Sequence, residues 1–291
     1  MMLTVALGPL TMALNHLLLI CALALASLVG WRVAKRGGDN PESVLFGLFL
    51  LGLFSARVGF VIRYWSMYQG DLLQIIDLRD GGFLAWPGVI VLLLAALYRG
   101  WRRPGLRRPL GFGVVSGVAF WVLATLSLNI YEQGTRLPDI TLRNAAGETV
   151  KLTDYQGGPL VINLWATWCP PCRREMPVLE NAQQQRPDLT FLFVNQAESM
   201  QSVATFLETQ GLSLNNVLFD RSGRLGQAVG SMALPTTLFY SPDGRLLGSH
   251  LGELSNASLA RALENFDTPG SSPNPATSSS RKLPCPASAT C

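Results

Sequence analysis

The sequence contains little histidine and little cysteine, which argues against a metal centre. Of the 291 residues, 2 are histidine and 5 are cysteine. A structural zinc site needs four nitrogen, sulfur or oxygen ligands, usually from these two residue types. Between residues 132 and 267 they occur only as Cys169, Cys172 and His250. We therefore expect no bound metal and no other cofactor.

Charged side chains are also scarce, at 14% of the chain, and the first half contains long stretches without any. A helix needs roughly 20 apolar residues to cross a bilayer. Four stretches come close to this length: 9–31, 43–65, 81–98 and 110–131. We predict an α-helical membrane domain over residues 1–131, with four transmembrane helices embedded in the lipid bilayer.

The charges that are present predict the orientation. Residues 1–131 carry 11 basic and 5 acidic side chains, and the basic ones gather in the loops 32–36 and 99–108. Positive loops stay in the cytoplasm. We therefore place the chain in the bacterial cytoplasmic membrane as a multi-pass protein, with residues 132–291 in the periplasm. Because the positive charge follows the first span, an uncleaved anchor is favoured over a signal peptide. This distribution also argues against nucleic-acid binding.

Two side chains within the predicted spans have consequences. Arg57 is costly if it faces lipid, so it either packs against a neighbouring helix, which we favour, or contacts a lipid headgroup. Cys21 is the one cysteine of this half. Electron relay by thiol exchange needs a pair of cysteines, so we expect a separate membrane electron donor that carries such a pair.

Residues 8–109 resemble the first three helices of prolipoprotein diacylglyceryl transferase. The matching stretches are Gly8–Pro9 at the start of the first helix, SARVGFVIRYW (55–65) and LLQIIDLRDGGFLAWPGVI (72–90). In that family a catalytic histidine follows the Asp-Gly-Gly segment, but Trp86 stands at its place here. An indole cannot act as a general base, and the family's later headgroup-binding segment is missing. The resemblance implies a shared scaffold without transferase activity.

The pattern changes after residue 132, and a domain over 132–267 is predicted to alternate strands and helices. A buried strand (159–166), a helix (173–185) and a second strand (189–196) form a β-α-β unit. A helix over 199–210 follows, then a hairpin over 234–252 with its turn at residues 242–244, and a closing helix over 255–266 with Ser255 as N-cap. This order is the one that an α/β thioredoxin-like fold needs.

The junction of the first strand and helix carries the motif Cys169-Pro170-Pro171-Cys172. The free N–H groups and the dipole of a helix start favour a thiolate at Cys169, which we expect to be the exposed member of the pair. Cys172, one turn further, is placed to attack a mixed disulfide formed at Cys169.

Residues 137–266 resemble the TlpA/ResA-like thiol–disulfide reductases, through LPDITLRNAAGETVKLTDYQGGPLVINLWATWCPPCRREMPVLE and LPTTLFYSPDGRLL. The resemblance implies that Cys169 and Cys172 form the redox disulfide and that Pro235 is a cis-proline beside it. It also places Glu175 near the active site. The substrate contacts expected from it are Trp168, Pro170, Pro171, Leu234, Pro235 and Thr236.

Glu175 has two interpretations. It lies one turn from Cys172 and could accept the proton of that thiol, since Asn163 on the preceding strand cannot titrate. Alternatively it is a solvated acid that complements the helix dipole. We favour the catalytic role.

We expect a thiol–disulfide oxidoreductase that reduces disulfides of periplasmic proteins, with apocytochrome c among the clients that the resemblance suggests. The alternatives are a dithiol oxidase, a thiol peroxidase or, least of all, a diacylglyceryl transferase. Against the peroxidase, Thr167 is only two residues before Cys169, whereas the peroxidase relatives have Thr-x-x-Cys. Residues 268–291 are rich in proline and serine and are expected to be disordered. Their two cysteines, Cys285 and Cys291, either pair with each other or are incidental, which we favour.

The predicted orientation can be tested with topology reporters. A reporter that works only outside the cytoplasm should be active when fused after residue 132. A reporter that works only in the cytoplasm should be active when placed in the loop 99–108, because positive loops are retained inside. Cytoplasmic activity beyond residue 132 would refute the orientation.

Overall fold

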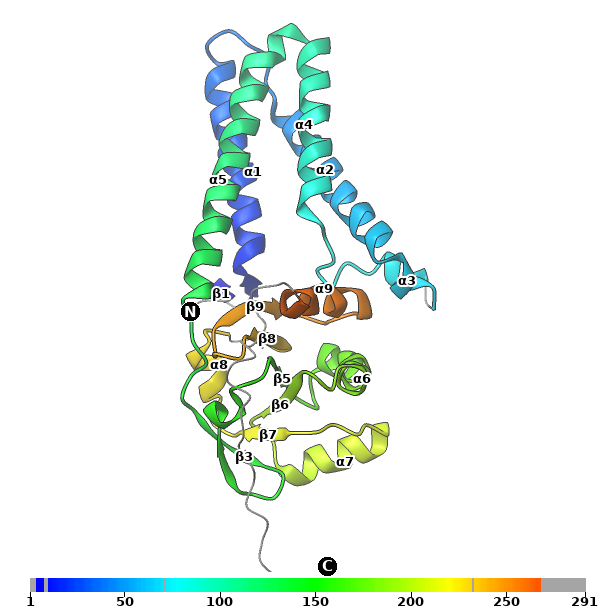
Figure 1. Cartoon of the computed structure of the whole chain (residues 1–291). Coiled ribbons are helices and arrows are strands. Elements are labelled where there is room, and N and C mark those ends of the chain that lie inside the picture. The colour runs from blue at the N-terminus through cyan, green and yellow to red at the C-terminus, as the bar shows by residue number, and fades with distance from the viewer. Residues whose placement is uncertain (1–3, 8–9, 71, 232, 268–291) are drawn as a thin grey trace, which may run out of the picture.

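The structure, a computed structural model, describes residues 4–7, 10–70, 72–231 and 233–267. In Figure 1 the helical first half stands above an α/β domain. The chain opens with an antiparallel pair of strands, β1 (Thr4–Leu7) and β2 (Leu10–Ala13). The first helix, α1 (Leu14–Ala34), therefore begins at Leu14, and the expected start at Gly8–Pro9 was wrong because residues 10–13 pair as a strand.

The other long helices of this half are α2 (Glu42–Arg63), α4 (Ala85–Arg102) and α5 (Arg107–Gln133). The short helices α3 (Trp65–Tyr68), η1 (Leu72–Ile75) and η2 (Pro104–Leu106) lie between them. Helix α1 packs on α5, and α2 on α4. Among the described residues, three segments are long and apolar enough to cross a membrane: Leu14–Ala34, Glu42–Arg63 and Pro104–Tyr131. Helix α4 is not among them, so the expected count of four spans is not confirmed.

Glycine permits the close approach of α2 and α4. A Cβ added at Gly88 would lie 2.6 Å from the carbonyl oxygen of Gly52 and 3.1 Å from Cβ of Ala56. Small residues at such a crossing let two backbones pack directly, which favours association of helices in lipid.

The α/β domain has a seven-stranded sheet of order β4-β3-β7-β6-β5-β8-β9. Its strands are β3 (Thr141–Asn144), β4 (Thr149–Lys151), β5 (Leu160–Trp165), β6 (Thr190–Gln196), β7 (Val217–Asp220), β8 (Thr236–Tyr240) and β9 (Leu246–Leu251). Strands β5 and β6 are parallel, and β8 and β9 form the expected hairpin. Its turn contains Gly244, whose φ of +77° suits glycine.

The helices of this domain are α6 (Pro170–Gln185), α7 (Met200–Gln210), α8 (Arg224–Ala228) and α9 (Asn256–Asp267), with the short turn η3 (Leu152–Tyr155). All six residues of β5 are buried, because apolar side chains cover both faces of the sheet. The thioredoxin-like fold predicted from the sequence is confirmed. The N-cap prediction for Ser255 is confirmed as well, since its hydroxyl accepts from the Ser258 N–H at 3.2 Å.

The two halves are joined without a free linker. Between α5 and β3 the chain pairs with the turn of the β8–β9 hairpin: the Leu246 N–H donates to the Thr135 carbonyl at 2.9 Å, and the Leu137 N–H to the Gly244 carbonyl at 2.8 Å. The connecting segment thus extends the sheet at this end and fixes the α/β domain to α5.

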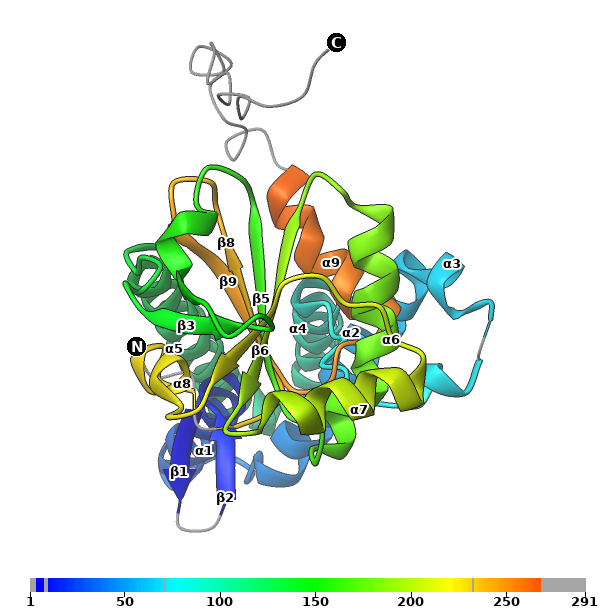
Figure 2. The same ribbon diagram turned by 90° about the horizontal axis from the view of Figure 1, so that it is seen from below.

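Helix α9 forms a second junction, since it lies between the sheet and the helical half (Figures 1 and 2). The Tyr64 hydroxyl donates to the Glu264 carboxylate at 2.9 Å, and Arg261 donates to the Phe83 carbonyl at 2.7 Å. Ala257 packs into a small apolar cluster that includes Phe60. The α/β domain is therefore docked on the helical half at two separated places.

The crossing of α2 and α4 can be tested by adding single methyl groups. Gly88→Ala should lower the free energy of unfolding by about 1–3 kcal/mol, because the new Cβ meets backbone that cannot yield. Gly47→Ala is the matched control on α2, since no atom lies within 4 Å of its added Cβ. Thermal unfolding in detergent would measure both, and equal melting temperatures for the two variants would contradict the proposed packing.

Candidate active site

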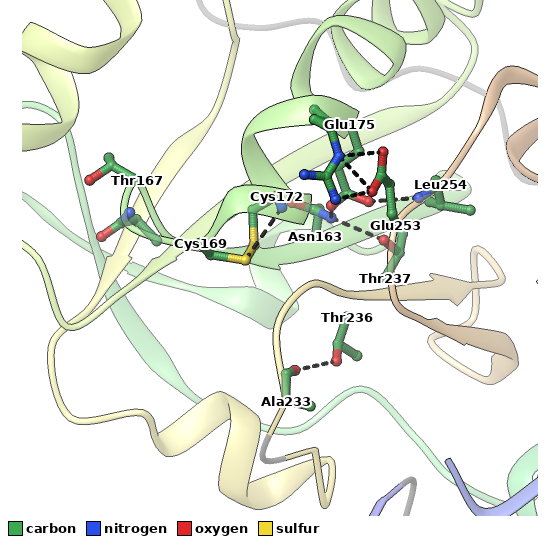
Figure 3. The surroundings of a disulfide bond; sticks show 12 residues. Asn163, Thr167, Cys169, Cys172, Glu175, Ala233, Thr236, Thr237, Glu253 and Leu254 are labelled. Atoms are coloured by element: carbon green, nitrogen blue, oxygen red, sulfur yellow. Dashed lines mark hydrogen bonds and ion pairs between the residues drawn. A yellow bond between two sulfur atoms is a disulfide. The ribbon is translucent and has the colours of Figure 1, made fainter. Parts of the chain in front are cut away.

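Cys169 and Cys172 lie where β5 passes into α6, and they form a disulfide with a Cα–Cα distance of 5.3 Å (Figure 3). Cys169 is the N-cap of α6, and the Cys172 N–H donates to its sulfur at 3.3 Å. In the reduced protein the same N–H group and the positive end of the helix stabilise a thiolate at Cys169.

The sulfur of Cys169 is less accessible than the sequence suggested. Cys169 is 4% exposed and Cys172 0%, whereas Trp168 is 66% exposed. The expectation of an exposed Cys169 was therefore wrong for the disulfide form, because its side chain packs in the apolar cluster that includes Trp165, Ala166 and Met176. A groove of about 660 Å³ leads to it, and of the expected substrate contacts it is lined by Trp168, Pro170, Pro171 and Leu234.

The opposite wall of this groove was not expected from the sequence. It comes from Gln196 and Ala197 at the end of β6 and from the segment 221–227 around α8. Ala197 has a φ of +62°, which is uncommon for a residue with a side chain. The position of this wall could have been predicted from the sheet topology, because the carboxyl ends of the parallel strands β5 and β6 meet at one edge of the sheet.

Pro235 and Thr236, two of the expected substrate contacts, are not among the residues that line the groove. The Leu234–Pro235 bond is cis, as expected, and Pro235 is buried. Thr236 is 0% exposed, and its hydroxyl donates to the Ala233 carbonyl at 2.8 Å. Its side chain thus holds the loop before β8 rather than facing a substrate.

Glu175 is not a solvated acid, because it is 0% exposed. Its Oε1 accepts from the side-chain amide of Asn163 at 2.8 Å, and its Oε2 accepts from the Leu254 N–H at 2.9 Å. Burial raises the pKa of this carboxyl to about 8, although both hydrogen bonds favour the charged form and oppose the shift. A carboxyl that titrates near the pKa of a thiol is suited to exchange a proton with Cys172, one turn away on α6.

Glu198 is a further residue of this site that the sequence did not reveal. Its carboxylate accepts from the Thr167 N–H at 2.7 Å, from the Thr167 hydroxyl and from the Asn195 side chain at 2.6 Å. These contacts link the loop that precedes Cys169 to the end of β6. Glu198 therefore fixes the position of the loop that leads into the Cys169–Cys172 motif.

Arg57 lies outside this site, in the helical half, and is 6% exposed. A guanidinium group has five N–H donors, and here every donor has a protein acceptor. The acceptors, at 2.6–3.1 Å, are the carboxylate of Asp80 and the carbonyls of Gln74, Ile75, Asp77 and Gly82. No donor is left for a lipid headgroup, so the packing role that the sequence favoured describes this arrangement.

Comparisons with known proteins match the two halves separately. A family model described as Redoxin matches residues 132–263, and one described as prolipoprotein diacylglyceryl transferase matches residues 2–123. Thiol-disulfide oxidoreductase ResA of Geobacillus thermodenitrificans is 31% identical over 157 residues, which are 50% of this chain and 90% of that protein. The chain belongs to the ResA-like thiol–disulfide oxidoreductases. Its helical half is similar to the prolipoprotein diacylglyceryl transferase family, whose model it matches.

Other relatives match the same half of this ResA-like protein. Thioredoxin-like protein YneN of Bacillus subtilis is 30% identical over 137 residues, covering 46% of this chain and 79% of that protein. Among solved structures, a thiol:disulfide interchange protein from Chlorobium tepidum is 25% identical, covers 45% of this chain and 94% of its own, and superposes with a TM-score of 0.40.

The role of Glu175 can be tested in this ResA-like enzyme with Glu175→Gln. The rate at which Cys172 resolves a mixed disulfide should rise in the unmodified protein as pH increases through about 8, because only the ionised carboxylate accepts a proton. The variant should resolve it about tenfold or more slowly at neutral pH. Stopped-flow measurement of thiol release across pH 5–10 gives both rates.

The stability of the same variant is the control for folding. The pKa of Glu175 rises from 4.5 toward about 8 on folding, so its contribution is present below pH 4.5 and is lost as pH rises through 8. Glu175→Gln should therefore be as stable as the parent at pH 4 and more stable at pH 9. The amide of Asn163 can turn its Oδ1, which has no partner among the described residues, toward the new side chain. Slow resolution with lowered stability would point to a structural role.

Proposed function

We propose that this protein is a membrane-anchored enzyme that reduces disulfides of periplasmic proteins. The observation that carries the proposal is the pair Cys169–Cys172 at the start of α6, with a buried carboxyl one turn away. Trp168 and the groove beside Cys169 offer a client chain an apolar surface next to the reactive sulfur.

The proposed reaction is dithiol exchange. The Cys169 thiolate attacks a client disulfide, which forms a bond between Cys169 and one client sulfur and releases the other client sulfur as a thiolate. Cys172 then passes its proton to Glu175 and attacks Cys169, so that the enzyme disulfide forms and the second client thiol leaves. Two electrons move from the enzyme to the client, whose sulfurs take up protons.

The arrangement of the helices supports a periplasmic position for the redox domain. The basic loops 32–36 and 99–108 lie at the end of the helical half far from this domain. We propose that α4 crosses the membrane as well, since α2 ends beside the redox domain and α5 starts at the far end. Four spans in the cytoplasmic membrane then place residues 132–291 outside.

Re-reduction of the disulfide requires a partner. Cys21 is the free cysteine among the described residues, and it stands alone on a membrane helix. We therefore propose a separate membrane protein with a cysteine pair as electron donor, and periplasmic proteins such as apocytochrome c as clients. The residues Cys285 and Cys291 lie outside the described residues.

The opposite direction, oxidation of client dithiols, uses the same groups and is the second candidate, because thiol–disulfide exchange is reversible and its direction depends on the reduction potential. Trapping the redox state of Cys169 and Cys172 in living cells separates the two. A mostly reduced pair supports the reductase, and a mostly oxidised pair the oxidase.

The exchange mechanism itself can be tested with Cys172→Ser. This variant should retain client proteins as mixed disulfides at Cys169, because the resolving sulfur is missing. Non-reducing electrophoresis and mass spectrometry of the full chain, purified from membranes, would identify them. Cys169→Ser is the matched control and should trap none. If neither variant accumulates a mixed disulfide, dithiol exchange is refuted.

A further inference from the structure

The loop between β9 and α9 donates backbone hydrogen bonds to two parts of the redox centre. The Gly252 N–H donates to the carbonyl of Pro235 at 3.0 Å, and the Leu254 N–H donates to Glu175 at 2.9 Å. Gly252 has a φ of +100°, a conformation that favours glycine. The backbone of residues 252–255 therefore sets the positions of both the cis-proline and the buried carboxyl.

The other side of this loop is held by the membrane half. The hydroxyl of Ser255 donates to Oδ2 of Asp80 at 2.8 Å, although the two residues are 175 positions apart. Gly81 lies against His250, since a Cβ added to it would be 3.4 Å from the imidazole, and the carbonyl of Arg79 faces Gly252 at 3.7 Å from its added Cβ. The turn 79–81 thus packs directly against the loop 252–255.

Asp80 is itself rigidly placed. It is 5% exposed, and its Oδ1 accepts from Arg57 at 2.9 Å and from the Gly82 N–H at 3.0 Å. Arg57 also binds four carbonyls of residues 74–82, so it fixes the whole segment that carries Asp80. A buried ion pair contributes little net stability, since desolvation offsets the attraction. What it does here is hold one carboxylate oxygen in a defined place for Ser255.

We propose that the membrane half positions the redox centre: Asp80, held by Arg57, is a positioning residue that fixes Ser255 and, through the loop 252–255, the hydrogen bond from Leu254 to Glu175. This inference rests on the proposed dithiol exchange. In this proposal the helical half not only anchors the enzyme in the membrane but also fixes the position of active-site groups.

The surroundings of Glu175 make this support measurable. The loop contributes the Leu254 N–H and the carboxylate of Glu253. Arg174 of α6 forms a salt bridge with this carboxylate at 2.6 Å and so neutralises its charge. Strands β5 and β8 contribute only the uncharged Asn163 and Thr237. On β9 lies His250, whose pKa is lowered by burial and which contacts the Glu253 carbonyl at 3.3 Å. Loss of the Leu254 N–H bond removes a contact that lowers the pKa of Glu175.

The test uses the reduced full-length chain in nanodiscs, with Cys21, Cys285 and Cys291 replaced by serine, and the aromatic disulfide 5,5′-dithiobis(2-nitrobenzoate). Attack by Cys169 breaks the reagent's disulfide and releases one thionitrobenzoate. Attack by Cys172 on the mixed disulfide forms the Cys169–Cys172 bond and releases the second. Two absorbance phases thus report the two steps separately.

Ser255→Ala should slow the second phase about tenfold at pH 7 and shift its midpoint to higher pH, with the first phase unchanged, because a displaced Leu254 N–H stabilises the carboxylate less. Asp80→Ala should have the same effect, and the double variant should be no slower than either single one. Ser255→Thr, which keeps the hydroxyl donor, should restore the rate.

Two controls separate positioning from general damage. Ser199→Ala removes the N-cap of α7 in the same domain, and Tyr64→Phe removes a different contact between the halves. Both should leave the second phase within twofold of the parent. If Ser255→Ala matches Ser199→Ala at every pH, or if the effects of Asp80→Ala and Ser255→Ala add, the proposal is overturned. If the parent chain shows no second phase, the proposed dithiol exchange fails instead.

Discussion

The proposed chemistry depends on a carboxyl group that is fully buried and whose hydrogen-bond partners among the described residues carry no charge. Glu175 receives one N–H from Asn163 and one from Leu254, and neither neighbour carries a charge. Arg174 precedes it in sequence but pairs with Glu253. Burial without a counter-charge raises the pKa of this acid to about 8, so that part of it is ionised near neutral pH and is able to accept a proton. It can therefore serve a thiol whose own proton is lost in the same pH range.

The sheet provides the stiffness that such a group requires. Strand β5 is buried along its whole length and delivers both Asn163 and the cysteine motif. Helix α6 places Cys172 and Glu175 on the same face, one turn apart. The groove beside Cys169 is lined by residues of the loops 221–223 and 231–234 and by the ends of β5, β6, α6 and α8, whereas Glu175 is bonded to Asn163 of β5 and to Leu254 of the loop before α9.

The sequence predicted those features that depend on neighbouring residues. The hydrophobic runs of β5 and β6, the cap of α9 at Ser255, the hairpin turn at Gly244 and the motif between Cys169 and Cys172 are all encoded locally. The family resemblance added Pro235 and drew attention to Glu175. It could not distinguish a solvated acid from a buried one, since that depends on the distant loop at Leu254.

Features that depend on long-range packing were missed for the same reason. Glu198 and the wall around α8 reach the active site only because β6 lies beside β5 in the sheet and β7 lies beside β6. The burial of Arg57 follows from the fold of the segment 72–82, which no periodic pattern reveals. The start of α1 was misplaced because an apolar strand and an apolar helix look alike over four residues.

The paired segment between α5 and β3 has a mechanical consequence. Many tethered enzymes reach their targets by swinging on a flexible leash, whose length sets the volume they explore. Here residues 135 and 137 are bonded to the hairpin, so the catalytic groove keeps a constant tilt relative to the bilayer. Under the proposed function, encounters arise from lateral diffusion of the whole molecule, and the disulfide of a client protein must reach the groove at the height above the lipid that this attachment sets.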